Sequence, residues 1–223
     1  MIINTDAIVL HRMKYKNSSL IARLFTKNEG KISIIVNGAS KQKGNLFGVI
    51  EPPNVIKLNY YKRKLGSLQT CKEAGFLSSN LPIKKDILKL SIALAVVEIL
   101  DKTLHENDIN SDIYSLAEKT LYTLNNSEIN PQLILAFFLL NLIHYLGFMP
   151  ELQEQENVTE VPKKIKIILA ELNSYTMDNL CDMENDNLNF LDIITFLEDY
   201  ITEHLRLNKK IQSLNMIREI VHG

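Results

Sequence analysis

Basic side chains in the first 80 residues are the groups of this sequence best suited to a shared chemical task. Residues 1–80 hold 13 Lys and Arg against 4 Asp and Glu, a net charge of +9, whereas residues 81–223 hold 12 against 22, a net charge of −10. Ammonium and guanidinium groups neutralise phosphates, so this contrast indicates a module that meets a polyanion, joined to an acidic body that does not. The candidate nucleic-acid-binding residues are Arg12, Lys14, Lys16, Arg23, Lys27, Lys31, Lys41, Lys43, Lys62, Arg63 and Lys64.

No group of side chains forms a recognisable catalytic constellation. The sequence lacks the glycine-rich phosphate-binding motifs and the nucleophile motif Gly-x-Ser-x-Gly. Glu98 and Asp101 lie three apart on one predicted helix face, but no His or carboxylate pattern accompanies them. Asp182 opens a segment that resembles a calcium loop, yet its sixth and twelfth positions are Asn187 and Ile193 instead of Gly and Glu. We therefore expect a protein that is not an enzyme and that needs no cofactor and no metal.

Cysteine use and hydropathy indicate the compartment. Cys71 and Cys181 are the only cysteines, so a disulfide framework is not expected and a reducing compartment is the default. No signal-peptide pattern opens the chain, and the longest apolar run, 133–146, is shorter than the roughly 20 residues of a membrane span. We expect a cytoplasmic, nucleoid-associated protein that does not enter a membrane.

These cations lie on and between segments that are predicted to be short strands. Segments rich in β-branched residues, separated by Gly, Asn and Pro, predict strands at 5–12, 19–26, 31–37, 55–61 and 67–77. Residues 38–47 lack periodicity and are expected to form a loop with Lys41 and Lys43 at its tip. Five antiparallel strands in about 75 residues suit a small closed barrel, and the OB-fold is the obvious candidate.

From Pro82 onward the apolar period changes from 2 to 3.6, which predicts an all-α second half. Helices are expected at 84–104, 112–124, 131–146, 163–172, 189–206 and 210–221. Ser111 is a good N-cap, and Asn130 followed by Pro131 predicts another helix start. The predicted fold is therefore α+β and multidomain: an OB-fold nucleic-acid-binding domain of residues 1–80, followed by an α-helical domain of residues 81–223.

In an OB barrel, the loops after the first and fourth strands flank the nucleic-acid groove. Most of the candidate cations fall in or beside these loops, where they could follow a phosphate backbone while aromatic side chains stack on bases. The aromatic residues nearest these loops are Tyr15, Tyr60 and Tyr61, for which core packing and stacking are both open.

Several separated segments together resemble the DNA repair protein RecO family. The resemblance spans nearly the whole chain, and it rests on order and spacing because each segment alone is weak. In the first half the matching residues are Ala7-Ile8-Val9-Leu10, Tyr15, Leu20-Ile21, Leu24-Phe25-Thr26, Gly30-Lys31, Val36-x-Gly38-Ala39, Tyr60-Tyr61, Leu68-Gln69 and Glu73-Ala74. In the second half they are Leu146-Gly147-Phe148-x-Pro150 and Tyr200-x-x-x-His204-Leu205 followed by Lys209-x-x-x-Ser213.

The sequence departs from this family at two places. Many members carry four zinc-ribbon cysteines after the Leu-Gly-x-x-Pro segment, but residues 151–190 contain only Cys181, so the chain resembles a variant without that metal site. Members often have a Gly-Glu-Ser/Ala-Asp turn where this chain reads Lys16-Asn17-Ser18-Ser19, which raises the local positive potential.

The resemblance implies a non-enzymatic recombination mediator. Such a protein would bind single- and double-stranded DNA, anneal complementary strands, and work with RecR to load RecA onto DNA coated by single-stranded DNA-binding protein. The helical domain would supply partner surfaces, and basic residues that could rim a groove for the acidic tail of single-stranded DNA-binding protein are Lys163, Lys164, Lys166, Arg206, Lys209 and Lys210. An OB-fold RNA-binding protein, a protein-binding adaptor and, most remotely, a metal-dependent nuclease stay open as alternatives.

Overall fold

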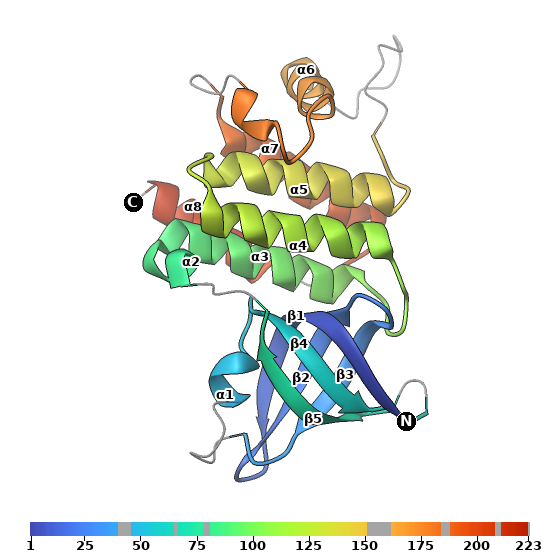
Figure 1. The fold of residues 1–223 in the computed structure, drawn as a ribbon. Helices are drawn as coiled ribbons and strands as arrows, with labels where there is room; N and C mark the ends of the chain where they lie inside the picture. The colour runs from blue at the N-terminus through green and yellow to red at the C-terminus, as the bar shows by residue number, and fades with distance from the viewer. Residues whose placement is uncertain are drawn as a thin grey trace.

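The computed structural model describes residues 1–39, 46–64, 67–77, 81–150, 162–183, 188–207 and 211–222. Figure 1 shows a β-barrel at the bottom, formed by the first part of the chain, and a stack of helices above it. The predicted α+β fold, a five-stranded OB-type barrel followed by helices, is confirmed.

The barrel closes in the strand order β1-β2-β3-β5-β4. A short helix, α1 (Leu46–Val49), lies between β3 and β4 at the end of the segment that was predicted to be a loop. Lys41 and Lys43, placed by the prediction at the tip of that loop, lie outside the described residues. The strands are β1 (Ile2–Tyr15), β2 (Ser19–Thr26), β3 (Gly30–Val36), β4 (Val55–Tyr61) and β5 (Gln69–Phe76).

One strand pairing differs from the predicted all-antiparallel barrel. β3 and β5 run parallel, whereas the pairs β1–β2, β1–β4, β2–β3 and β4–β5 are antiparallel. A closed ring with an odd number of strands cannot reverse direction at every step, so at least one pair must be parallel. Here the parallel seam is short and pairs Ile34 with Gln69 and Ile35 with Thr70.

The middle of β1 is buried on both faces. Ala7 and Val9 point into the barrel core, whereas Ile8 and Leu10 belong to the core of the helical half. A register shift follows between Val9 and His11, which is the position of a β-bulge. β1 therefore serves both as a wall of the barrel and as the surface on which the helices rest.

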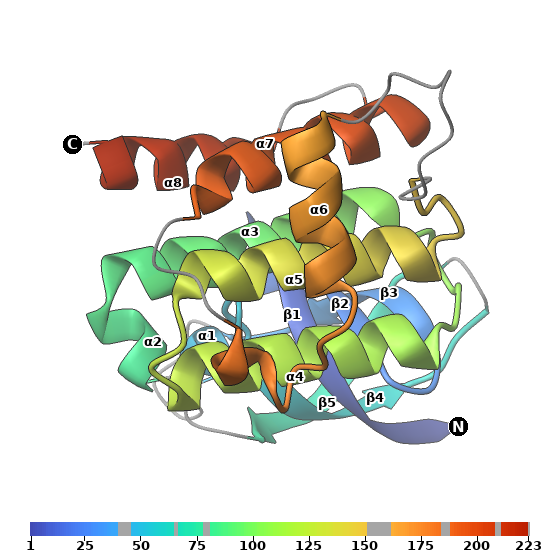
Figure 2. The same cartoon turned by 90° about the horizontal axis from the view of Figure 1, so that it is seen from above.

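The helical half is built around a long buried helix, α5. Every residue from Leu133 to Ile143 except Asn141 is buried in it, and α5 packs against α3, α4 and α7. Figure 2, viewed from above, shows α6 running across α5 on the side away from the barrel. The helices are α2 (Leu81–Lys85), α3 (Ile87–Thr103), α4 (Ser111–Asn126), α5 (Pro131–Tyr145), α6 (Lys163–Leu172), α7 (Phe190–His204) and α8 (Gln212–His222), with a single 3₁₀ turn at Leu180–Asp182.

Side-chain caps set the helix boundaries. The single helix predicted over 84–104 is instead α2 and α3, because Asp86 caps α3 by accepting hydrogen bonds from the amides of Leu88 and Lys89. Asn110, and not the predicted Ser111, caps α4. Asn130 caps α5 as predicted.

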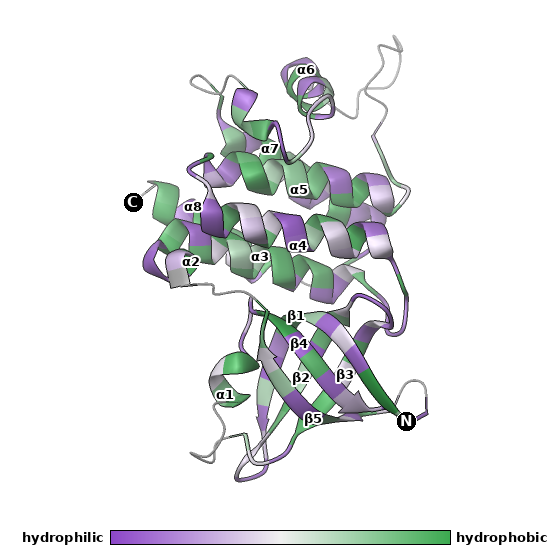
Figure 3. Cartoon of the chain, viewed as in Figure 1, coloured by the Kyte–Doolittle hydropathy of each residue, from purple (hydrophilic) through white to green (hydrophobic). Residues whose placement is uncertain are grey.

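The core is divided between the two halves of the molecule. The barrel interior holds one apolar cluster, and a larger cluster in the helical half extends onto the barrel through Phe25 and Val55. In Figure 3, α4 alternates between hydrophilic and hydrophobic residues along its length, as expected for a helix with one buried face. Within the described ranges, no helix is both long enough and apolar enough to cross a membrane.

The turn between β2 and β3 fits closely against the α3–α4 connection. Lys31 and Glu106 form a parallel β-bridge, and the amide of Asn107 donates to the carbonyl of Lys31 at 2.8 Å. Gly30 has a φ of +69°, and a Cβ at this position would lie 2.2 Å from the carbonyl oxygen of Asp108. The barrel therefore contacts the helices through the backbone as well as through side chains.

Candidate nucleic-acid interface

Six side chains, here called the outer row, form a continuous line across the outside of the barrel. Each pairs in register with the next on the neighbouring strand, and paired residues point to the same side of a sheet. Their neighbours along β2, β3 and β4 lie in the barrel core, so the row itself faces outward. In order around the barrel the outer row is Met13, Ile21, Ile35, Thr70, Tyr61 and Ile2.

The outer row is apolar apart from Thr70 and the Tyr61 hydroxyl, and it is accessible at both ends. Met13 is 52% exposed, Tyr61 is 44% exposed and Ile2 is 49% exposed. Ile21 and Ile35, in the middle, are half-buried. The exposed apolar side chains therefore lie toward the ends of the row, on β1 and β4. The half-buried middle of the row crosses β2 and β3, the strands through which OB-folds bind oligonucleotides.

Cations stand at both ends of this row. At the Met13 end, the hairpin between β1 and β2 carries Lys14, Tyr15 and Lys16, all exposed, with the Lys16 ammonium 5.3 Å from the centre of the Tyr15 ring. At the other end, Tyr61 is followed directly by Lys62, Arg63 and Lys64. Cations and an exposed aromatic ring are thus present at each end, because Tyr15 and Tyr61, two of the three tyrosines for which stacking and core packing were both open, are exposed. The third, Tyr60, is buried in the barrel core.

A buried glutamine holds the loop between β4 and β5. The side chain of Gln69 accepts a hydrogen bond from the amide of Arg63 at 2.6 Å and donates to the carbonyl of Ser67 at 2.6 Å. Lys62 forms an ion pair with Glu29 at 2.6 Å. Arg63 and Lys64 are exposed, and neither is paired with a carboxylate among the described residues. Sequence reasoning missed the roles of Gln69 and Glu29, because Gln69 entered only through the family resemblance and Glu29 is an acid in a site that was sought among basic residues.

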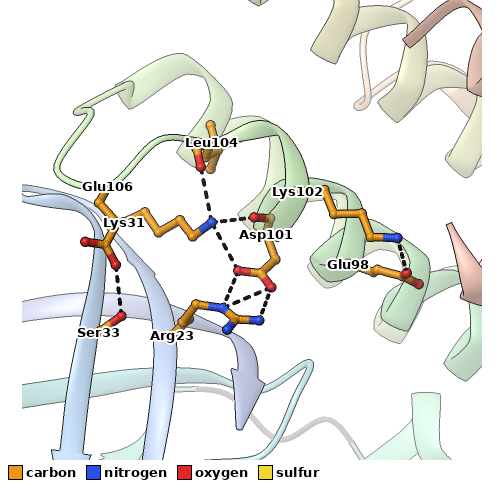
Figure 4. Close-up of polar contacts among 8 residues, drawn as sticks. All are labelled: Arg23, Lys31, Ser33, Glu98, Asp101, Lys102, Leu104 and Glu106. Atoms are coloured by element: carbon orange, nitrogen blue, oxygen red, sulfur yellow. Dashed lines mark hydrogen bonds and ion pairs between the residues drawn. The ribbon is translucent and has the colours of Figure 1, made fainter. Parts of the chain in front are cut away.

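Two of the predicted cations lie elsewhere, at the contact between the barrel and α3. Arg23 donates to Asp101 through Nε at 2.8 Å and through Nη2 at 2.5 Å. The Lys31 ammonium lies 3.1 Å from the Asp101 carboxylate and donates to the backbone carbonyls of Asp101 and Leu104, at the end of α3 (Figure 4). These contacts give Arg23 and Lys31 a structural role in joining the two halves, and we do not propose them as nucleic-acid contacts.

The charge state of Asp101 follows from this arrangement. Burial alone would raise the pKa of Asp101, but the hydrogen bonds and charges of Arg23 and Lys31 outweigh it and hold that pKa below its usual value. The carboxylate is therefore ionised at neutral pH and keeps both cations in place.

Another cation of the barrel, Arg12, also has local contacts. The Arg12 guanidinium donates to the carbonyl of Phe47 at 2.6 Å and to Glu51 at 3.0 Å, and it lies 4.2 Å from the centre of the Phe47 ring. Arg12 thereby fastens α1 against β1. Lys27 is exposed in the turn between β2 and β3.

Of the cations predicted to rim a partner groove, three lie in α6 and one follows α7. Lys163 and Lys164 are exposed in the first turn of α6, Lys166 is half-buried, and Arg206 is exposed just after α7. Lys209 and Lys210 fall outside the described residues. A pocket of about 290 Å³ lies instead between α4 and the ends of β4 and β5, lined mainly by Val55, Leu77, Leu121 and Tyr122. None of the predicted cations lines it.

The two carboxylates noted on α3 act separately. Asp101 faces the barrel. Glu98 instead accepts hydrogen bonds from the backbone amides of Gln212 and Ser213 and from the Ser213 hydroxyl, and so holds the start of α8. Glu98 also pairs with Lys102 (Figure 4). In the part of the chain that the structure describes, no three His, Cys, Asp or Glu side chains gather in a way that could hold a metal ion. Part of the calcium-like segment, residues 184–187, lies outside that part.

Comparison with known proteins gives matches over most of the chain. Residues 1–80 match the family model described as Recombination protein O N terminal, and residues 84–160 match Recombination protein O C terminal. The chain is 29% identical over 239 residues to the DNA repair protein RecO of Flavobacterium psychrophilum, and the match covers 99% of each chain.

Two further relatives match over a shorter region. The DNA repair protein RecO of Pelodictyon phaeoclathratiforme is 30% identical over 153 residues, or 69% of this chain and 59% of the relative. That of Prosthecochloris aestuarii is 29% identical over 154 residues, or 69% of this chain and 58% of the relative. This chain thus matches less than two thirds of the length of these two relatives.

Proposed function

This chain belongs to the RecO family of DNA repair proteins, and we propose that it is a non-enzymatic recombination mediator that binds DNA across the outer row of its barrel. One observation carries the proposal: the outer row runs between two cationic loops, each with an exposed tyrosine. Residues 1–80 would form the nucleic-acid-binding domain, and residues 81–223 would support it and bind partners.

The chemistry of the outer row supports binding of unpaired bases. Base stacking on an aromatic side chain contributes about 1–3 kcal/mol per base and tolerates every sequence, because all bases have a π-face. Lys14 and Lys16 at one end, and Lys62, Arg63 and Lys64 at the other, would neutralise the phosphates of the same strand. The resulting affinity is independent of sequence and falls with salt, because each neutralised phosphate releases a condensed counterion.

The same surface supports strand annealing. Two complementary strands repel each other through their phosphates, and a protein that neutralises part of that charge lowers the barrier to pairing. In keeping with the family, we propose that the chain works with RecR to load RecA onto strands coated by single-stranded DNA-binding protein. The exposed lysines of α6 and Arg206 remain candidates for the acidic tail of that protein. This function requires no cofactor.

Charge reversal in the β4–β5 loop tests the proposal. Arg63→Glu together with Lys64→Glu should weaken binding of a labelled single strand at least about tenfold, and should flatten the salt dependence, since each lost phosphate contact removes about 0.7 from the slope for single strands. Fluorescence anisotropy across a salt series measures the affinity and its salt dependence.

Lys57→Glu, on the outer face of β4 beside Asp6, is the control and should have a smaller effect on the affinity. Tyr61→Ala should weaken binding without changing the salt slope. Affinity that ignored salt and all of these substitutions would overturn the proposal.

The alternatives predict other results in the same titration. An RNA-binding protein would prefer an RNA competitor through its 2′-hydroxyls. A protein-binding adaptor would not retain single-stranded DNA at moderate salt.

A further inference from the structure

Lys62 differs from its two neighbours in the β4–β5 loop because it already holds an anion. Its ammonium lies 2.6 Å from the Glu29 carboxylate, whereas Arg63 and Lys64 are exposed and have no carboxylate partner among the described residues. Glu29 is 33 positions away in the sequence, in the turn between β2 and β3. A carboxylate from another part of the barrel is therefore already paired with one cation of the proposed DNA surface.

The turn that carries Glu29 is held in place. The backbone amide of Glu29 donates to the Thr26 hydroxyl at 3.1 Å, and that hydroxyl donates to the carbonyl of Gly30 at 2.7 Å. Gly30 in turn lies against the backbone of Asp108 in the α3–α4 connection. The fold therefore holds the backbone of Glu29 in place, within reach of Lys62 for its carboxylate.

The ion pair is accessible to an exchanging anion. The side chains of Lys62 and Glu29 are 34% and 23% exposed. A phosphate oxygen offers an ammonium a negative charge and a hydrogen-bond acceptor, as a carboxylate oxygen does, and a partly exposed ion pair contributes little net free energy. A DNA phosphate could therefore replace Glu29 at little energetic cost.

We propose that Glu29 is an intramolecular competitor of the DNA backbone for Lys62, and that it sets the affinity of the barrel for DNA. This inference rests on the proposed DNA binding. While Glu29 holds Lys62, the loop presents fewer free cations to a polyanion. DNA must displace the carboxylate, so Lys62 contributes less to affinity and to salt dependence than a free lysine would.

A double-mutant cycle tests the inference on the full chain. The variants are Glu29→Gln, Lys62→Gln and both together, measured by anisotropy with a labelled single strand across a salt series. Glu29→Gln should tighten binding at low salt by up to about fivefold, the equivalent of a surface ion pair, and should steepen the salt slope by up to about 0.7. In the Lys62→Gln background, Glu29→Gln should no longer tighten binding or steepen the salt slope, because the lysine for which Glu29 competes is absent.

A matched control separates competition from net charge. Glu73→Gln also removes one carboxylate from the barrel, but Glu73 accepts a hydrogen bond from the side-chain amide of Asn59 at 3.2 Å and has no cation partner among the described residues. Its effect on affinity should be smaller than that of Glu29→Gln, and independent of Lys62. Thermal unfolding of each variant shows whether the fold persists.

The outcomes distinguish this inference from the proposed function. If the wild-type chain binds DNA and responds to Arg63→Glu and Lys64→Glu, but Glu29→Gln equals Glu73→Gln, the inference fails alone. Weaker binding by Glu29→Gln would also overturn it, because Glu29 would then position Lys62 for DNA and not withhold it. If the wild-type chain binds no DNA at all, both the inference and the proposed function fail.

Discussion

Gly30 packs against the backbone of the α3–α4 connection. Its φ of +69° is unfavourable for any residue with a Cβ, and that Cβ would lie 2.2 Å from the carbonyl oxygen of Asp108. Gly30→Ala should lower the free energy of unfolding by more than about 1–2 kcal/mol, the usual cost of a left-handed L-residue, because the clash also displaces the α3–α4 connection. Urea denaturation measures the change.

Gly75 supplies the matched control for this substitution. It lies in β5, and a Cβ there would meet no atom within 4 Å. Gly75→Ala should therefore change stability by less than about 1 kcal/mol. If the two alanine variants unfolded at the same urea concentration, the close approach at Gly30 would not matter to stability.

Single cations show what sequence reasoning could and could not reach. Composition alone predicted that the first 80 residues are basic, but not which cations stay exposed. Arg23 and Lys31 are held by Asp101, 78 and 70 positions away, and Lys62 by Glu29. Such partners come together only when the barrel closes and the helices dock, so no local spacing in the sequence marks them.

Among the elements, α3 is joined to the barrel by the Asp101 carboxylate. Asp101→Asn removes the charge that balances Arg23 and Lys31, and leaves the Lys31 ammonium, with a side chain 9% exposed, without an anion. Breaking a buried ion pair in this way costs about 3–5 kcal/mol, and we expect the lower end because Arg23 stays partly in water. Chemical denaturation at neutral pH measures the loss. A change below about 1 kcal/mol would show that the ion pairs contribute little beyond the apolar contact.

The same carboxylate predicts a pH dependence. The pKa of Asp101 is lower in the folded chain than its usual value of 3.8, so the folded state holds the proton less tightly than the unfolded state. Its contribution to stability is therefore fully present above the usual pKa, and is lost as the pH falls through the lower, folded value. Because Asn does not titrate, the difference in the free energy of unfolding between wild type and Asp101→Asn should become smaller at acidic pH. A difference that did not change with pH would contradict a lowered pKa for Asp101.

Element boundaries were predictable where local chemistry decides them. Apolar periodicity predicted the five strands and most of the helices, and Asn130 with Pro131 predicted the start of α5. The break at Asp86 was missed because the apolar stripe continues across it, although Asp is a preferred N-cap. The parallel seam between β3 and β5 was available in principle, since an odd number of strands forces it on any closed barrel.

At the scale of the whole molecule, the barrel and the helices share one core. Ile8, Leu10, Phe25 and Val55 lie in strands but are buried among helical side chains, and Phe25 meets Tyr114 edge-on with ring centres 5.5 Å apart. A strand with both faces buried looks, in sequence, like any apolar run, which is why the change of period at Pro82 predicted two domains but not how closely they pack. The DNA surface that we propose therefore lies on a closed barrel, one side of which packs against the helices.

This shared core predicts that the two halves unfold together. Separating them would expose the four apolar side chains of the barrel and break the Asp101 ion pairs, so a state with only one half folded should be scarcely populated. Native-state hydrogen exchange on the full chain measures this, because slowly exchanging amides of β2 and of α5 should report the same free energy of opening. Asp101→Asn should lower both values equally. If β2 exchanged through a lower-energy opening that Asp101→Asn promoted while α5 stayed protected, the barrel would be an independent unit. A partner bound to the helices could then not restrain the proposed DNA-binding face through the contact between the barrel and α3.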